Sequence, residues 1–381
     1  MPEPSIAYLS QRKLHVRQNG ATKTIESDYA RQVRERAASI DRRHAWKSQG
    51  RGAMFMGAAA QAVQPDAPIV LTGLAPAPAG ALLYSMETDA VSGIFLLDSA
   101  GLETRLFHTA DFRIRHIALN PAGEKLAVAI FHKDNSRSSI AVLPLRGTDF
   151  TEITEGDSFD QAPRWTPGGQ SIVFQSAGIG RNQAGHFAGL APCAIQEYDA
   201  ATGGLAEAAA DPARDLLRPA RDAEGALYYI RKPYESGAPD ASFLSSLKDA
   251  ALFPFRLGRA IFQYFNVFSM MYTGKPLVSA KGAAQRRMDP RQMFINGNLA
   301  AAAMSQADSG DGPGAAPASW ELIRHPAGGR PEVLAKRVLA YDLMPGGAVL
   351  YSDGATITQL DASGRAECVV RAESIEQVLA L

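Results

Sequence analysis

Short apolar segments recur along most of this chain, and turn residues separate them. The clearest unit is residues 162–174, where an apolar segment ending at Trp165 precedes Thr-Pro-Gly-Gly-Gln and the run Ser-Ile-Val-Phe. Pro presets φ and Gly accepts positive φ, so this order predicts a strand, a tight turn and a second strand. Residues 116–131 have the same order in a weaker form. The unit is therefore repeated at least twice.

The predicted strands fall into sets of four. These sets occupy residues 69–108, 115–154, 162–208, 217–335 and 338–371. The turn glycines Gly80, Gly123, Gly169 and Gly225 are 43, 46 and 56 residues apart, close to the period of about 40–50 residues in propeller repeats. Four strands per repeat is typical of a β-propeller blade.

The two ends of the chain each hold an incomplete set. Three short strands are predicted over 5–26, with an Asn19-Gly20 hairpin turn, and residues 374–381 supply one further strand. Pairing the C-terminal strand with the three N-terminal strands completes a sixth set of four, and this closure removes exposed sheet edges. The sequence therefore predicts an all-β chain, a single six-bladed β-propeller domain over 1–381 that the C-terminal strand closes.

Residues 28–65 interrupt the strand pattern near the N-terminus. Apolar side chains recur at intervals of three and four residues, at Tyr29, Val33, Ala37 and Ile40. This spacing predicts a helix over 28–47 with Asp28 as N-cap, and a Gly- and Ala-rich connector follows to residue 65. The other face is basic and includes the candidate partner-binding residues Arg34 and Arg42. Such a face is either simply solvated or docks to an acidic partner.

A second interruption, residues 234–318, is interpreted as an insertion within the fifth blade. Its helical pattern over 242–272 is aromatic and basic, and its tail over 300–318 has a composition typical of disorder. The candidate partner-binding residues are Arg256, Leu257, Arg259, Ile261, Phe262, Phe265, Phe268 and Tyr272. Because so many aromatic rings need cover, three roles remain open: packing on the propeller, docking to a partner protein, or lying on a membrane surface.

Composition narrows the list of partners. Lys plus Arg equals Asp plus Glu at 39 each, so global charge does not indicate nucleic acid. The start of the chain has no basic region followed by an apolar one, and we expect a cytoplasmic protein. Cys193 and Cys368 have no metal or redox spacing and are expected to be buried free thiols.

No combination of residues in the sequence predicts catalysis. A Gly-x-Ser-x-Gly nucleophile motif is absent, and the histidines lack zinc spacing. The glycine-rich residues 178–185 fit neither a dinucleotide fingerprint nor a phosphate loop and are expected to form a loop. Asp157 and Asp160 are expected in exposed loops. We therefore predict no catalytic, cofactor-binding or metal-binding residue and no cofactor.

The run over 163–174, Pro-Arg-Trp-Thr-Pro-Gly-Gly-Gln-Ser-Ile-Val-Phe, resembles the repeats of TolB-type six-bladed β-propellers. The weaker copy over 121–131 supports the resemblance, which implies the fold. The helix ending in His44-Ala45-Trp46-Lys47 and the Gly-rich segment after it also resemble the propeller component of bacterial systems that pair a MoxR-type ATPase with von Willebrand A domain proteins. That second resemblance implies such a protein as partner.

These observations favour a non-enzymatic scaffold of a cytoplasmic bacterial complex that docks through the amphipathic aromatic insertion. One alternative is a propeller that binds a small molecule or sugar, or hydrolyses it, at its central channel. The other is a propeller that associates peripherally with a membrane.

Overall fold

The computed structural model describes residues 4–48, 69–88, 91–133, 136–181, 187–234 and 316–381. The connector over 49–65 and the candidate residues between 256 and 272 lie outside this part, so their predictions stay predictions. Within it, the chain is mostly β-strand, with one α-helix, α1 (Asp28–Ser48). For the described residues, the prediction of a β-rich chain with a helix near the N-terminus is confirmed.

Four of the sheets have four strands each. The first has the order β25 (Ile375–Ala380), β1 (Ile6–Ser10), β2 (Lys13–Gln18), β3 (Ala21–Ile25). The second runs β4 (Val70–Pro76), β5 (Leu82–Glu87), β6 (Ser92–Leu97), β7 (Glu103–Thr109). The third runs β17 (Arg214–Arg221), β18 (Leu227–Pro233), β19 (Glu321–His325), β20 (Glu332–Lys336). The fourth runs β21 (Ala340–Leu343), β22 (Val349–Ser352), β23 (Thr356–Leu360), β24 (Ala366–Arg371).

The remaining strands form a sheet of nine. One half holds β8 (Phe112–Leu119), β9 (Lys125–His132), β10 (Ser138–Pro144) and β11 (Thr151–Glu152). The other half holds β12 (Ser158–Trp165), β13 (Ser171–Arg181), β14 (Phe187–Leu190), β15 (Ala194–Asp199) and β16 (Leu205–Ala209). The parallel pair Ser138↔Phe159 joins β10 to β12. Each half therefore has its own antiparallel meander.

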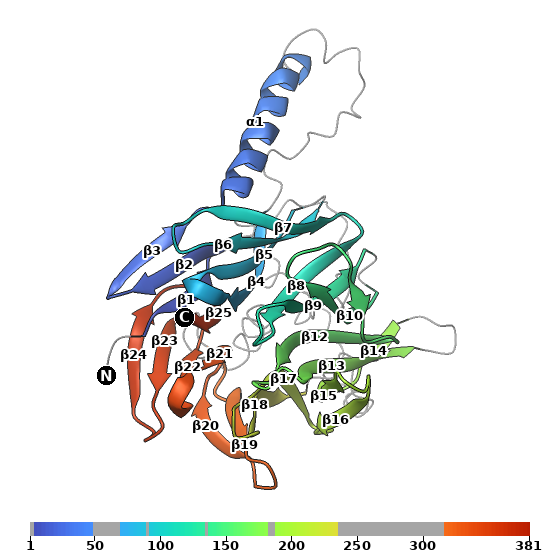
Figure 1. Ribbon diagram of the computed structural model, residues 1–381, viewed down its shortest axis with the longest axis vertical. Coiled ribbons are helices and arrows are strands. Elements are labelled where there is room, and N and C mark those ends of the chain that lie inside the picture. Colours follow the sequence, from blue (N-terminus) through green and yellow to red (C-terminus); the bar gives the residue numbers. More distant parts are fainter. Residues whose placement is uncertain (1–3, 49–68, 89–90, 134–135, 182–186, 235–315) are drawn as a thin grey trace, which may run out of the picture.

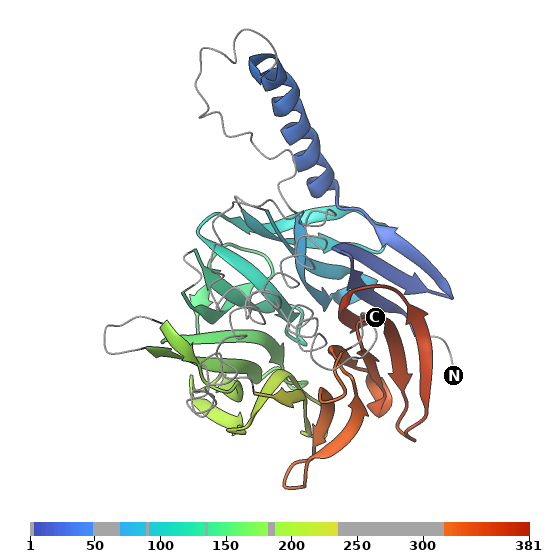
Figure 2. The same ribbon diagram turned by 180° about the vertical axis from the view of Figure 1, so that it is seen from behind.

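The sheets surround the middle of the molecule (Figure 1). Strands β4, β8, β12, β17, β21 and β25 lie nearest the middle, and the view from behind in Figure 2 agrees. Neighbouring inner strands contact each other from β25 to β4, β4 to β8, β8 to β12 and β12 to β17, and β21 contacts β25. The two ends of the chain meet where β25 pairs with β1.

Apolar side chains are buried between neighbouring sheets. One such cluster joins Leu83 and Ile94 of the second sheet to Ile114 and Val128 of the next, and all four are at most 1 % exposed. Trp320, 1 % exposed, lies in another cluster with Leu217 and Tyr341. Because burial of a large apolar side chain contributes about 1.5–3 kcal/mol, these contacts hold each sheet against its neighbours.

The structure corrects four local expectations. Ser27, not Asp28, is the N-cap of α1, because the Ala30 amide donates to Ser27 Oγ at 3.1 Å. Residues 178–181 continue β13 instead of forming a loop, since Gly180 pairs with Gly189. Asp160 is a buried residue of β12, 3 % exposed. Cys193 is buried as expected, whereas Cys368 is exposed on β24, the outer strand of its sheet.

Candidate binding site at the centre of the sheets

Several inner strands carry a β-bulge, which places an extra residue near the middle of the molecule. In β8, Arg115 pairs with Ala129 and Ile117 with Val128, so His116 is the extra residue. Arg218 and Pro219 lie at the bulge of β17. Glu376 is the extra residue of β25, between the partners of Leu9 and Ser10. Bulges re-aim side chains and recur next to functional sites.

Arg218 reaches across the middle of the molecule from β17 to β25. Its Nη2 donates to the Glu376 carbonyl oxygen at 3.3 Å, and its backbone amide donates to Gln175 Oε1 at 2.8 Å. The Tyr341 hydroxyl donates to the Arg218 carbonyl at 2.7 Å. Burial, with repulsion from Arg164, lowers the pKa of Arg218 to about 10. Arg218 therefore stays charged at neutral pH within a partly desolvated site.

Glu376 is a half-buried carboxyl beside two arginines. Burial raises the pKa of Glu376 to about 7, although the charges of Arg218 and Arg12 oppose that change. Desolvation disfavours the ionised form and is the larger effect here. The Glu376 side chain therefore changes its protonation state close to neutral pH.

His116 faces the same cluster from β8. Burial, together with the charges of Arg218 and Arg115, lowers the pKa of His116 to about 3, so the ring is neutral at pH 7. Its Nδ1 atom is buried and has no hydrogen-bond partner among the described residues. A buried polar atom without a partner costs free energy and therefore needs an explanation.

A second charged pair crosses the middle close by. Arg164 Nη2 of β12 lies 2.7 Å from Asp342 Oδ1 of β21. Asp342 Oδ2 also accepts a hydrogen bond from the Ala380 amide of β25 at 2.8 Å. The buried Asp342 carboxylate thus connects three inner strands, and the Arg164 guanidinium is paired with it.

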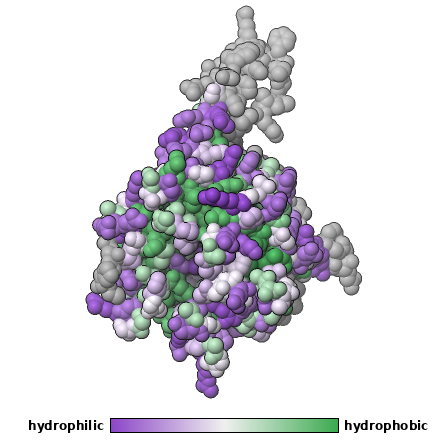
Figure 3. All heavy atoms as spheres, in the orientation of Figure 1, coloured by the Kyte–Doolittle hydropathy of each residue, from purple (hydrophilic) through white to green (hydrophobic). Residues whose placement is uncertain are grey.

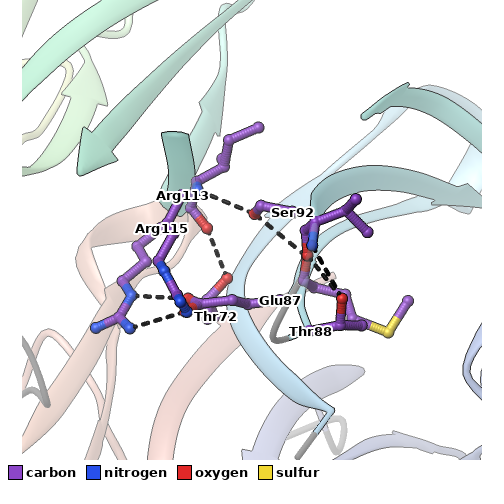
Figure 4. Close-up of polar contacts among 9 residues, drawn as sticks. Thr72, Glu87, Thr88, Ser92, Arg113 and Arg115 are labelled. Carbon is purple, nitrogen blue, oxygen red and sulfur yellow. Dashed lines mark hydrogen bonds and ion pairs between the residues drawn. The ribbon is translucent and has the colours of Figure 1, made fainter. Parts of the chain in front are cut away.

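Glu87 forms a comparable junction between the second sheet and β8 (Figure 4). Its carboxylate accepts from Arg113 and, at 3.1 Å, from Arg115 Nε. Next to it, Ser92 Oγ accepts from the Ile114 amide at 2.9 Å, and Thr72 Oγ1 donates to the Ile114 carbonyl at 2.9 Å. The Glu87 side chain is 6 % exposed, so this ion pair is largely shielded from solvent.

The helix α1 begins on the second sheet and then leaves the body of the molecule (Figures 1 and 2). The Glu103 carboxylate accepts from the amides of Asp28 and Tyr29 at 3.1 and 3.0 Å. A carboxylate at this position satisfies free N–H groups and complements the helix dipole. Ala30 is 4 % exposed, and the Tyr29 ring packs on Phe95 at 5.2 Å between centroids.

Of the candidate residues named from the sequence, Arg34 is described in full. It is exposed on α1 and pairs with Glu26 at 3.1 Å. Arg42 lies on α1 beyond the part whose side chains the structure describes. His116, Arg218 and Glu376 were missed. The available signal was the alignment of the repeats, which places His116 and Arg218 at the position of Ala162.

The described part of the chain contains neither a cluster of metal ligands nor a helix suited to span a membrane. No group of three or more metal-ligating side chains comes together there. None of its helices is both long and apolar enough to cross a membrane.

No family model and no curated protein sequence matches this chain. Among solved structures, TolB from Acinetobacter baumannii superposes with a TM-score of 0.53 at 12 % identity over 98 % of this chain. The match covers 66 % of that TolB, slightly less than two thirds of its length. The tricorn protease matches at a TM-score of 0.49 and 11 % identity, over 99 % of this chain and 34 % of its own. One chain of a nidogen/laminin complex matches at a TM-score of 0.49 and 10 % identity, over 99 % of this chain and 98 % of its own.

At such identities the likeness to TolB shows the fold alone. The chain has a TolB-like β-propeller fold, as the repeat pattern predicted. The comparisons indicate neither a MoxR-type ATPase nor a von Willebrand A domain protein as partner.

The raised pKa of Glu376 predicts a pH-dependent stability. The folded chain keeps this proton up to a pH of about 7, whereas the unfolded chain releases it near 4.5. The stabilisation of the folded state by the protonated Glu376 carboxyl is therefore complete below pH 4.5, and it is lost as the pH rises through 7. Relative to Glu376→Gln, the wild type should lose at most about 3 kcal/mol over this range, measured by urea unfolding at each pH.

His116 acts in the opposite direction, because its lowered pKa makes the folded state less stable as the pH falls below 6.5. The wild type and Glu376→Gln both keep His116, so the difference between their free energies of unfolding reports Glu376 alone. A pH-independent difference would show that the Glu376 carboxyl is well solvated.

Proposed function

We propose that this chain is a non-catalytic, cytoplasmic protein-interaction scaffold on a six-bladed propeller closed by β25 against β1. In this proposal, α1 is a docking element for a protein with an acidic surface. The observation that carries it is the course of α1, which is anchored at its first turn and then extends away from the sheets.

A projecting helix lacks the usual source of helix stability. Most helices in proteins are stabilised by packing an apolar face against the rest of the fold. Beyond Ala30, the described side chains of α1 are exposed or half-buried, with Val33 and Ala37 in the second group. Figure 3 shows hydrophilic residues over the base of α1. A partner that covers the Val33 and Ala37 face would supply the missing packing.

The charge of α1 selects the partner. Residues 28–48 contain six Lys or Arg and three Asp or Glu. Arg31 and Arg34 pair with Asp28 and Glu26, yet all four side chains are more than half exposed. Exposed pairs of this kind contribute only about 0–1 kcal/mol and exchange readily for a better partner. An acidic surface is therefore the complementary one.

The likeness to TolB is a likeness of fold, and it supports a binding role only to that extent. Peptidases share the same fold, so the fold alone does not select binding over hydrolysis. A MoxR-type ATPase or a von Willebrand A domain protein is one candidate partner, suggested by the sequence resemblance alone. The insertion over 234–318, with Leu257 to Tyr272, is proposed as a second docking element.

The test compares the full chain with Arg31→Glu/Arg34→Glu/Arg42→Glu. Proteins that copurify with the full chain from its native cell are expressed, purified and remixed with each variant. We expect a stoichiometric complex by size-exclusion chromatography, and at least tenfold weaker binding for the triple variant by calorimetry. The matched control, Arg330→Glu/Arg365→Glu/Arg371→Glu, reverses three exposed arginines away from α1 and should bind normally.

Equal loss of binding in both triple variants would remove α1 from the proposal and indicate a general charge effect. A chain that forms no reconstituted complex would overturn the scaffold proposal itself. Deletion of 242–274 in the same assay tests the insertion, and flotation of that deletion with anionic vesicles separates protein docking from membrane association.

A further inference from the structure

Arg218 differs from the other arginines around it in the carboxyl that compensates its charge. Arg164 pairs with Asp342, and Arg113 and Arg115 share Glu87. The carboxyl that acts on Arg218 is Glu376, which is about half-protonated near pH 7. A buried charge without full compensation is costly, so the Arg218 guanidinium is suited to an anion.

Arg218 has the free hydrogen-bonding capacity that an anion would use. A guanidinium carries five N–H donors in a planar fork. The side chain of Arg218 makes one hydrogen bond within the described residues, the 3.3 Å contact of Nη2 with the Glu376 carbonyl. By contrast, Arg221, three residues further on the same strand, makes three bonds of 3.1 Å or less to Glu197 and Gly225.

His116 supplies a second, independent indication. Its buried Nδ1 lacks a partner in the described part of the chain, and its ring is close enough to Arg218 for that charge to lower its pKa. A neutral imidazole can present N–H at this atom. An anion at this position would select the tautomer that donates from Nδ1.

The backbone supports the same assignment. His116 and Arg218 adopt φ of 50° and 53°, in the left-handed region. Bulky residues there cost about 1–3 kcal/mol, and such strain is concentrated at binding and active sites. Ala162 holds the equivalent place in β12 with φ of 50°, so the fold itself requires the conformation but not a polar side chain. The chain has placed polar groups at two of these strained positions.

We propose that the centre of the sheets binds a small oxyanion, a phosphate or a carboxylate, between Arg218 and His116, beside Glu376. All three residues are partly exposed, so a ligand can approach them from solvent, and the His116 ring turns to bring its buried Nδ1 to that ligand. Glu376 makes binding proton-linked, because its ionised form repels the anion and its protonated form does not. The site is separate from α1 and does not depend on the scaffold proposal.

The experiment is a calorimetric titration of the full chain with sodium phosphate, acetate or citrate, at constant ionic strength in chloride. Saturable binding of one oxyanion is expected, and it should be at least tenfold weaker in Arg218→Gln. The control, Arg221→Gln on the same strand, should retain the wild-type affinity. Tighter binding of phosphate indicates a phosphorylated ligand, and tighter binding of citrate or acetate indicates a carboxylate.

Glu376→Gln provides a readout that a structural role would not produce. At pH 8 this variant should bind at least threefold more tightly than the wild type, and at pH 6 the two should converge. If Arg218→Gln does not fold, this gain in affinity keeps the test decisive. Absence of saturable binding for all three anions, or affinities unchanged by both substitutions, would overturn the proposal.

Discussion

Deletion of residues 374–381 should abolish cooperative folding of this chain. Ile375, Val378 and Leu379 are at most 2 % exposed, and each contributes about 1.5–3 kcal/mol by burial. The deletion also removes every hydrogen bond between β25 and β1, which exposes a sheet edge. The sum approaches the whole stability of an ordinary domain, about 5–15 kcal/mol. Urea unfolding followed by circular dichroism would measure the loss.

The matched control removes only Leu381, whose side chain is 42 % exposed. It should unfold within about 1 kcal/mol of the full chain, because it forfeits a single backbone hydrogen bond to Ser5. A 374–381 deletion that kept the unfolding midpoint of the full chain would contradict closure and favour an open arrangement of the sheets.

Substitution of Glu87 should produce the second largest effect. Glu87→Ala leaves Arg113 and Arg115 without their shared carboxylate at the junction of β5 and β8. Breaking one partner of a buried pair costs about 3–5 kcal/mol. Arg113 is 37 % exposed and regains some hydration, so we expect a loss below that range, about 2–3 kcal/mol. Chemical denaturation of both chains gives this difference directly.

Two further variants define the cause. Glu332→Ala removes an exposed carboxylate that lies 3.8 Å from Arg324, and it should change stability by less than about 1 kcal/mol. Glu87→Leu combined with Arg113→Met and Arg115→Met replaces the charges by apolar groups and should recover most of the loss. Failure of this triple variant to recover stability would show that the carboxylate acts through more than charge pairing.

The strand pattern could be predicted because it depends on local chemistry. The Thr-Pro-Gly-Gly turn and the Ile-Val-Phe run after it are sufficient to predict β12 and β13, and both strands are present. The pairing of the last strand with the first was predicted by counting strands, since an unpaired edge is unfavourable. The N-cap at Ser27 was missed because Asp28 is an equally good capping residue by type.

The polar groups at the centre could not be found by the same reasoning. Their partners are far apart in sequence: Arg164 meets Asp342, and Arg218 meets Glu376. No local preference distinguishes these arginines from solvated ones on an outer strand. His116, Arg218 and Glu376 lie at bulges in β8, β17 and β25, and these bulges depend on the register between strands.

By itself, the sequence determined the alternation of strands, the turns and the propeller class, because these depend on residue periodicity and turn conformation. The tertiary structure alone decided which charges meet, that α1 leaves the body after its first turn, and that His116 and Glu376 both lie near Arg218. The physical reason is that burial and electrostatic pairing depend on distance in space, which only the arrangement of the sheets around their centre sets.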